Sequence, residues 1–340
     1  MRTRGTWAVW ALGILAVILV GMGNAAVAGP ADFAKLVPAG HEAFIYVDVA
    51  RARSSKLYLD IKPKLFDENT SAGLAMIQQL TGMKVPDDID VVAASGKIAA
   101  DNQGCLYVQG RWDRQRILSF LAMNPSYTEI PKPGGKVYGF VDEKKGSMNY
   151  LAFLDDHLAV IGNKNAVEAC VDGPSAKGPS WADNPSVKAC LADNVPNPVA
   201  IVIALRPAAL PANLANLPSL QNLRSVFLEF LEGPEVLTLV VRAEADSQQM
   251  AARWLDVVRG AIAVGQIQNK VPRLAEIANQ TTAAQNGSVV EVKAQVKTAS
   301  ASGFLQQKIA EGRANQPSVG GRRVGQGQPG QGEKPVPPVW

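Results

Sequence analysis

The feature that most constrains the fold of this chain is a similarity between its two halves. The stretch "VPAGHEAFIYVDVAR" (37–51) has a counterpart in "VPNPVAIVIALR" (195–206), and "LYVQGRWDRQRI" (106–117) has one in "LVVRAEADSQQM" (239–250). In the second pair Asp113 and Asp246 both stand where a helix cap is expected, directly after a strand. The order strand, helical region, strand, strand, helix holds in both halves, so we predict a duplicated β-α-β-β-α unit.

The hydrophobic pattern predicts an α+β fold. Short alternating runs rich in β-branched residues indicate strands, and the clean alternation in "VVEVKAQVK" is typical of a half-buried antiparallel strand. Amphipathic segments indicate helices between them. We therefore expect two similar modules with mainly antiparallel sheets and helices packed on one face. Strands are expected at 43–49, 90–95, 105–112, 127–130, 136–142 and 148–154, within 195–207, on both sides of 232–234, and at 287–298.

Composition shifts divide the chain. Residues 1–28 are predicted to form a signal peptide with a helical apolar run, and 29–173 to form the first module. A linker at 174–184, rich in Gly, Pro and Ser, precedes the second module at 185–312. The Gly/Gln/Pro-rich tail, 313–340, has few apolar residues and is expected to be disordered.

The N-terminus has the pattern of a secretory signal. Arg2 and Arg4 precede an apolar run over 8–22, and Ala26-Val27-Ala28 gives a small-x-small site with cleavage expected after Ala28. The run is long for a signal and short for a membrane span, so an uncleaved anchor is the alternative. The predicted location is secreted or periplasmic, with contact to a membrane only through an uncleaved signal segment.

The distribution of charge argues against nucleic-acid binding. The formal net charge is +4, but the basic residues of the N-terminus and the tail account for it and leave about −1 on the body 29–312. A nearly neutral body lacks the basic surface that phosphate binding requires.

The three cysteines, Cys105, Cys170 and Cys190, leave two interpretations open. In an oxidising compartment Cys170 and Cys190 are a candidate disulfide pair, because they lie on expected helices on either side of the linker. The alternative is that all three are buried small apolar residues. No Cys/His spacing fits a zinc site.

No motif for catalysis, a metal or a cofactor is present. Ser95 ends a strand but lacks the flanking glycines of a nucleophile elbow, and "PKPGGKVYG" lacks the spacing of a phosphate-binding loop. Asp87, Asp88 and Asp90 lack the spacing of a calcium loop and are interpreted as polar residues before a strand. We therefore predict no catalytic, cofactor-binding or metal-binding residues, and no cofactor.

Two histidines and two tryptophans are further candidates for residues of a functional site. His41 lies in the loop before the first strand, and His157 follows Asp155-Asp156 in "NYLAFLDDHLAVIGNKN". If Asp155-Asp156 is a two-residue hairpin loop, Phe153 faces Leu158, and a four-residue turn is the alternative; either way the carboxylates lie at a solvated tip. Trp112 and Trp254 are expected to pack in the core rather than form a ligand platform.

The segments "LVPAG", "FIYVDVA" and "LAFLDDHLAVIGNKNAVEAC" resemble those of a loose family of uncharacterised exported bacterial proteins with duplicated α+β modules. The resemblance rests on patterning over about 31–312. It implies an α+β exported fold and brings no catalytic residues.

These observations favour an exported cell-envelope protein that acts as a non-catalytic binding or structural module for an unknown envelope protein or ligand. We do not expect an enzyme. A secreted hydrolase with a carboxylate-based site, which needs no sequence motif, is one alternative. A signal-anchored periplasmic protein is the other.

Overall fold

The computed structural model describes residues 28–38, 40–66, 68–97, 104–142, 146–173, 180–192, 198–205, 222–267 and 272–314. Within these residues no helix is long and apolar enough to cross a membrane. The predicted signal peptide (except Ala28), most of the predicted linker and most of the predicted tail lie outside the described residues.

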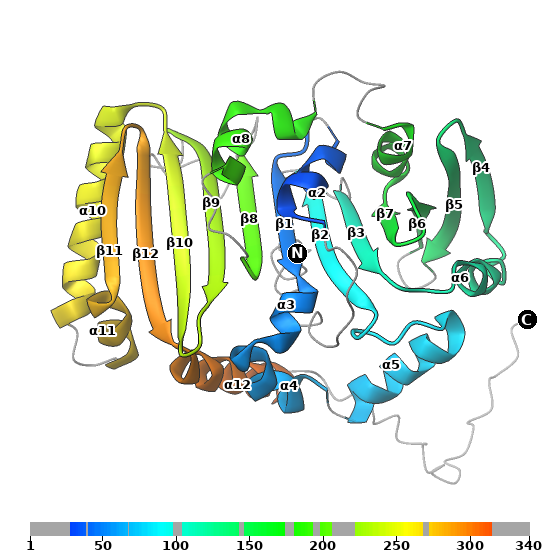
Figure 1. The fold of residues 1–340 in the computed structure, drawn as a ribbon, viewed down its shortest axis with the longest axis horizontal. Coiled ribbons are helices and arrows are strands. Elements are labelled where there is room, and N and C mark those ends of the chain that lie inside the picture. The colour runs from blue at the N-terminus through cyan, green and yellow to red at the C-terminus, as the bar shows by residue number, and fades with distance from the viewer. Residues whose placement is uncertain are drawn as a thin grey trace, which may run out of the picture.

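The fold is an α+β structure built on one antiparallel sheet of 12 strands, in the order β11-β12-β10-β9-β8-β1-β2-β3-β7-β6-β5-β4 (Figure 1). The strands of both predicted modules belong to this single sheet. The strands are β1 (Ala43–Asp48), β2 (Ile89–Gly96), β3 (Gly104–Gly110), β4 (Thr128–Lys132), β5 (Gly135–Asp142), β6 (Ser147–Phe153), β7 (Leu158–Gly162), β8 (Ala200–Leu205), β9 (Leu223–Glu232), β10 (Val236–Ala245), β11 (Thr281–Asn286) and β12 (Val289–Lys297).

The two halves of the sheet meet where β1 pairs with β8. The register runs from Ala43 opposite Ala204 to Val47 opposite Ala200, and the pairing is antiparallel. Phe44 and Tyr46 of β1 therefore lie beside Ile203 and Ile201 of β8 on one face of the sheet. Both pairs are buried, so the core continues across the junction without interruption.

Helices pack on both faces of the sheet, so the prediction of helices on one face is wrong. The face that carries Phe44 and Tyr46, here called the α2 face, is covered by α2, α7, η2 and α8. The opposite face, here called the α10 face, contacts α6 through Tyr138 and α10 through Val290. The helices are α2 (Pro30–Leu36), α3 (Val49–Ser54), α4 (Lys56–Leu65), α5 (Glu68–Thr81), α6 (Arg114–Leu121), α7 (Lys164–Asp172), η2 (Trp181–Asp183), α8 (Pro185–Ala192), α10 (Gln248–Ile267), α11 (Pro272–Asn279) and α12 (Thr298–Ala314).

The reason for this two-sided cover is visible in the burial of the strands. Successive side chains of a β-strand point to opposite faces of the sheet, and in β2 every residue except Ala94 is buried. Val91 and Ala93 pack under the α2 face, whereas Val92 belongs to a cluster on the α10 face. A strand that is apolar on both sides needs cover on both sides.

Side-chain caps fix where several helices begin. The carboxylate of Asp113 accepts a hydrogen bond from Arg116 N at 3.0 Å and caps α6, as the sequence predicts. For α7 the cap is Asn163, whose side chain accepts from Ala166 N at 2.9 Å.

The β6–β7 hairpin differs by one residue from the predicted register. Phe153 pairs with Ala159, not with Leu158, because the loop holds three residues, 155–157, between Leu154 and Leu158. A shift of one residue in the pairing moves every side chain of one strand to the opposite face of the sheet relative to its partner strand. Val160 thus joins Ala152 on the α2 face.

One strand was not predicted. The sequence of β11, "TTAAQN", contains no large apolar residue and therefore gives no alternating hydrophobic signal. It is an edge strand that pairs only with β12, and α10 covers part of it.

Candidate functional site

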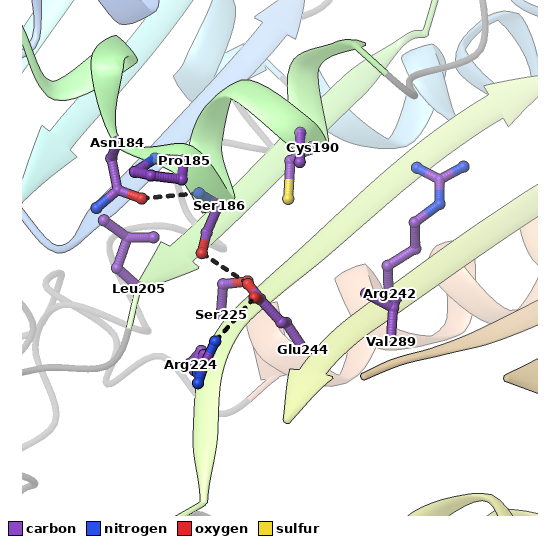
Figure 2. Close-up of a pocket in the computed structure, with 11 residues that line it drawn as sticks. Asn184, Pro185, Ser186, Cys190, Leu205, Arg224, Ser225, Arg242, Glu244 and Val289 are labelled. Carbon is purple, nitrogen blue, oxygen red and sulfur yellow. Dashed lines mark hydrogen bonds and ion pairs between the residues drawn. The ribbon is translucent and has the colours of Figure 1, made fainter. Parts of the chain in front are cut away.

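A pocket of about 580 Å³ lies on the α2 face, between α8 and strands β8, β9, β10 and β12 (Figure 2). Its polar side chains come from elements that are far apart in sequence. Residues that line it are Asn184, Pro185, Ser186, Ala189, Cys190, Leu205, Arg224, Ser225, Arg242, Glu244 and Val289.

Glu244, on β10, is the centre of the polar part of the pocket. The hydroxyl of Ser186 donates to Glu244 Oε2 at 2.6 Å, and the hydroxyl of Ser225 donates to the same oxygen at 3.0 Å. Ser186 is itself held by α8, where its backbone N–H donates to Asn184 Oδ1 at 3.0 Å. Figure 2 shows Ser186 and Cys190 pointing from α8 toward the strands.

Two arginines of the pocket each contact more than one carboxylate. Arg224 is half exposed, with Nη1 3.8 Å from Glu244 Oε1 and Nε 3.3 Å from Asp246 Oδ1. Arg242 Nε donates to Glu291 Oε2 at 2.8 Å. Its Nη1 lies 3.8 Å from Glu229 Oε2, a carboxylate that is fully buried.

The arrangement offers a ligand adjacent groups of opposite charge. The 3.8 Å separation between Arg224 Nη1 and Glu244 Oε1 is longer than a hydrogen bond. Arg224 Nη1 can therefore donate to a ligand, and Glu244 Oε1 can accept from one. Pro185, Ala189, Leu205 and Val289 supply apolar contact around them. A mainly apolar lining with a few convergent polar groups is typical of a small-molecule or peptide site.

Sequence reasoning singled out none of the polar residues of this pocket. Ser186, Ser225 and Glu244 lie on α8, β9 and β10, and no local motif joins them. The one sequence signal is that Arg242 and Glu244 put two charged residues on the same face of β10, where Glu244 lies opposite Ser225 of β9.

The structure brings His41 together with Ser95. His41 Nδ1 is 2.9 Å from Ser95 Oγ, which is 3.2 Å from the hydroxyl of Tyr107. Burial, with a smaller contribution from Lys97, lowers the pKa of His41 to about 4. His41 and Ser95 are both buried under Trp181, whose indole N–H donates to the carbonyl of His41, so this pair is part of the core.

His157 lies far from His41. The backbone carbonyl of His157 accepts from Gly110 N at one end of β2, whereas Glu42 N binds Gly96 O at the other end. With about 3.4 Å per residue the two ends of β2 are roughly 24 Å apart. Asp155, Asp156 and His157 are exposed at the hairpin tip, as predicted.

The aspartates at the start of β2 and in the turn before it bind arginines. Asp90 Oδ1 lies 3.4 Å from Arg53 Nη2 and Asp90 Oδ2 lies 3.5 Å from Arg111 Nη1, while Asp88 contacts Arg111 at 3.4 Å. Asp90 is buried, which the interpretation as a polar loop did not anticipate. Among the described residues there is no cluster of His, Cys, Asp or Glu that could hold a metal ion.

The fold does not bring Cys170 and Cys190 together. None of the three cysteines forms a disulfide in the structure. Cys170 is on α7, which packs on β3 and the strands beyond it, whereas Cys190 is on α8 over β8 and β9. These helices are separated by at least three strand spacings, roughly 14 Å, and a disulfide requires Cα atoms within about 7 Å.

The two tryptophans pack against apolar side chains. Trp112 lies beside Phe153 with ring centroids 6.2 Å apart, in the cluster under α6. Trp254 belongs to the cluster between α10 and β12. Neither lines the pocket.

No family model and no curated protein matches the chain. It is similar in structure to crystal forms III, IV and I of TP0453, with TM-scores of 0.43, 0.45 and 0.43 and identities of 10%, 9% and 10%. The alignments cover 83%, 82% and 83% of this chain and 100%, 100% and 98% of those chains. Similarity at this level carries no argument about function.

Proposed function

We propose that this chain is an exported cell-envelope protein that binds a ligand without chemically changing it. The observation that carries the binding proposal is the pocket beside Glu244, where a carboxylate and the Arg224 guanidinium lie 3.8 Å apart. A ligand that bears both an amino and a carboxylate group matches this pair. The ligand class is therefore a short peptide or a peptide terminus of an envelope partner.

The serines support this assignment because they leave part of Glu244 free to recognise a ligand. Both hydroxyls donate to Oε2, so the position and orientation of the carboxylate are fixed before a ligand arrives. Oε1 lies 3.8 Å from Arg224 Nη1, too far for a hydrogen bond between them, so a ligand ammonium group can donate to this oxygen. Preorganised polar groups lower the entropic cost of binding.

Titration of the mature chain with trialanine tests this proposal. We expect saturable binding by calorimetry that Glu244→Gln and Arg224→Gln each weaken about tenfold or more, since a charged hydrogen bond contributes about 1.5–3 kcal/mol. Arg259→Gln, which removes an exposed arginine on α10, is the matched control and is expected to bind normally. Equal affinity in all four proteins, or no binding of trialanine, would contradict the proposal.

A hydrolase is the second candidate, and one observation favours it. Ser186 lies 2.6 Å from Glu244, so a hydroxyl and a carboxylate that could act as its base meet inside the pocket. The two functions give different results with Ser186→Ala. Loss of ester or peptide turnover would support the hydrolase, whereas weaker trialanine binding without any turnover in the parent protein supports a binding protein.

Export is supported by the basic start, apolar run and Ala26-Val27-Ala28 site of the N-terminus. Mass spectrometry of the native N-terminus distinguishes the two forms of the proposal. A chain that begins at Gly29 is secreted or periplasmic, and a chain that retains residues 1–28 is signal-anchored.

We also propose that the two halves are related modules. The strand orders on either side of the β1–β8 junction support this: β1-β2-β3-β7-β6 on one side corresponds to β8-β9-β10-β12-β11 on the other. The first module then carries the hairpin of β4 and β5 as an addition at its edge.

A further inference from the structure

The sheet ends in two edge strands that differ in how they are protected. At one edge, β4 carries Pro131 and two charged residues, Glu129 and Lys132, which form ion pairs with Lys136 and Glu168. At the other edge, β11 contains neither a proline nor a charged residue. Proline and charged side chains on an edge strand hinder pairing with a further strand. β4 is therefore protected against such pairing, whereas β11 lacks these features.

The pairing of β11 with β12 shows which backbone groups of β11 point out of the sheet. Gln295 N donates to Gln280 O at 3.1 Å, and these two residues continue the β11–β12 register. In an antiparallel pair, the backbone groups of successive residues point alternately toward the partner strand and away from it. Because Gln280 points toward β12, the N–H and C=O groups of Thr281, Ala283 and Gln285 point away. In the part of the chain that the structure describes, no group hydrogen-bonds to them.

Helix α10 lies over this edge of the sheet (Figure 1). Gln285 Nε2 donates to Gln248 O at 3.0 Å, and Gln266 Nε2 donates to Ala278 O at 3.4 Å. The helix therefore begins beside the end of β11 and ends beside the residues that precede β11. Because Ala278 belongs to α11, which packs on β12, the side of α10 that carries Gln266 faces the middle of the sheet.

The opposite side of α10 is apolar and exposed. At about 100° per residue, Val257 and Val264 lie roughly half a turn round the helix from Gln266. They therefore point outward, beyond β11, and their exposed fractions are 72% and 53%. A strand added to β11 would turn every second side chain toward this apolar side of the helix.

We propose that the free edge of β11 binds an extended peptide segment of another protein as an additional strand of the sheet. The outward N–H and C=O groups bond to the peptide backbone, and apolar side chains at every second position of the peptide pack against α10. Thr282, Ala284 and Asn286 are exposed on the α2 face, where the other side chains of the peptide would lie. Two copies paired through β11 would bring both α10 helices to the same edge, so a single peptide fits better than a second copy.

The inference goes beyond the binding of a ligand at Glu244 and does not depend on it, because the pocket contains no residue of β11 or α10. The two sites can therefore be tested separately.

Fluorescence anisotropy with the labelled peptide KTVTVTVTK and the full chain tests the proposal, and we expect saturable binding. Ala283→Pro removes one outward N–H and keeps the groups that pair with β12, so it should weaken binding about tenfold or more. Ala283→Val keeps this N–H and should bind normally. Val257→Lys should also weaken binding, whereas Ala252→Lys, on the side of α10 that faces the middle of the sheet, is the matched control and should not.

Two N-methylated peptides give a decision even if Ala283→Pro fails to fold. The N–H groups of the valines and those of the threonines point to opposite edges of an extended peptide, and only one edge faces β11. Methylation of one set should weaken binding about tenfold or more, and methylation of the other set should leave it unchanged.

Three results would overturn the proposal. The first is that the unsubstituted chain does not bind the peptide, and the second is that both N-methylated peptides bind with equal affinity. The third is a dimer, seen by size-exclusion chromatography, that Ala283→Pro dissociates, because a second copy would then occupy the edge of β11.

Discussion

A buried, neutral histidine gives this protein a specific sensitivity to acid. His41 forms its hydrogen bond with Ser95 inside the core, and burial lowers its pKa to about 4 from an ordinary value of 6.5. The unfolded chain therefore binds a proton at this site more readily than the folded chain. The stability that depends on neutral His41 is complete above pH 6.5 and is lost as the pH falls toward 4.

His41→Asn measures this contribution. Below pH 4 protonation should cost the folded protein about 3 kcal/mol, from the difference between the two pKa values. Asn retains a polar partner for Ser95 but does not titrate in this range. Between pH 7 and 4, Tm should fall more steeply for the unsubstituted protein than for the variant, and parallel curves would show that another group dominates.

Among Asp87, Asp88 and Asp90, at or next to the start of β2, Asp90 is the residue whose removal should lower the stability most. It contacts both Arg53 and Arg111, and Asp90 and Arg53 are both buried. Asp90→Ala leaves Arg53 without its carboxylate partner, which should lower the free energy of unfolding by about 3–5 kcal/mol. Urea unfolding measures this change.

The matched control is Asp32→Ala, which breaks the exposed pair with Lys35 on α2. Exposed pairs contribute about 0–1 kcal/mol. If both variants lose the same free energy of unfolding, the burial of Asp90 does not make its ion pairs more important for stability.

At the scale of elements, β7 depends on a glycine at its end. A side chain at Gly162 would collide with the backbone of Gly104 on the neighbouring strand β3. Gly162→Ala must therefore displace one strand, with an expected loss of about 1–3 kcal/mol. Gly260→Ala on α10 meets open space and should stabilise its helix by up to about 1 kcal/mol. Thermal unfolding of the two variants should show shifts of opposite sign.

Most strands and helices could be predicted because each carries its own local pattern. The alternation in β12 and the cap at Asp113 are examples of such signals. The missed strand β11 has no apolar pattern, since it is an edge strand made of small and polar residues. The hairpin register was wrong by one because it depends on the loop conformation, where Asp155 Oδ1 accepts from His157 N and holds a third loop residue.

Long-range features could not be predicted from local patterns. Which helices cover each face of the sheet depends on contacts between elements that are distant in sequence. Likewise, Ser186, Ser225 and Glu244 come together as the polar part of a pocket only when the sheet has folded. The positions of Cys170 and Cys190 are of the same kind. The sequence places each of them on an expected helix, but it does not show how far apart the two helices lie.

At the scale of the whole molecule, the junction of β1 with β8 makes the two halves dependent on each other. Separation at the predicted linker would expose β8, whose inward side chains Ile201 and Ile203 are fully buried, as an apolar edge strand. Unpaired apolar edges promote aggregation.

Residues 185–314 expressed alone should therefore not give a stable monomer, although the sequence predicts 185–312 as a module. Size-exclusion chromatography and circular dichroism can check this expectation, with the full chain as the reference. A folded monomeric fragment with a cooperative unfolding transition would show that the junction is dispensable for the second half.

The β1–β8 junction also has a consequence for the order in which the chain folds. Ala43 is synthesised about 160 residues before its partner Ala204. Contacts between residues so far apart in sequence are slow to form, and a chain that waits for them exposes apolar surface in the meantime. During synthesis, β1 therefore emerges early and can complete its pairing only when the second half has been made. The pairing of β1 with β8 at the centre of the sheet is then a late event in folding. If this pairing is delayed, the unpaired edge of β1 can pair with another strand or another chain.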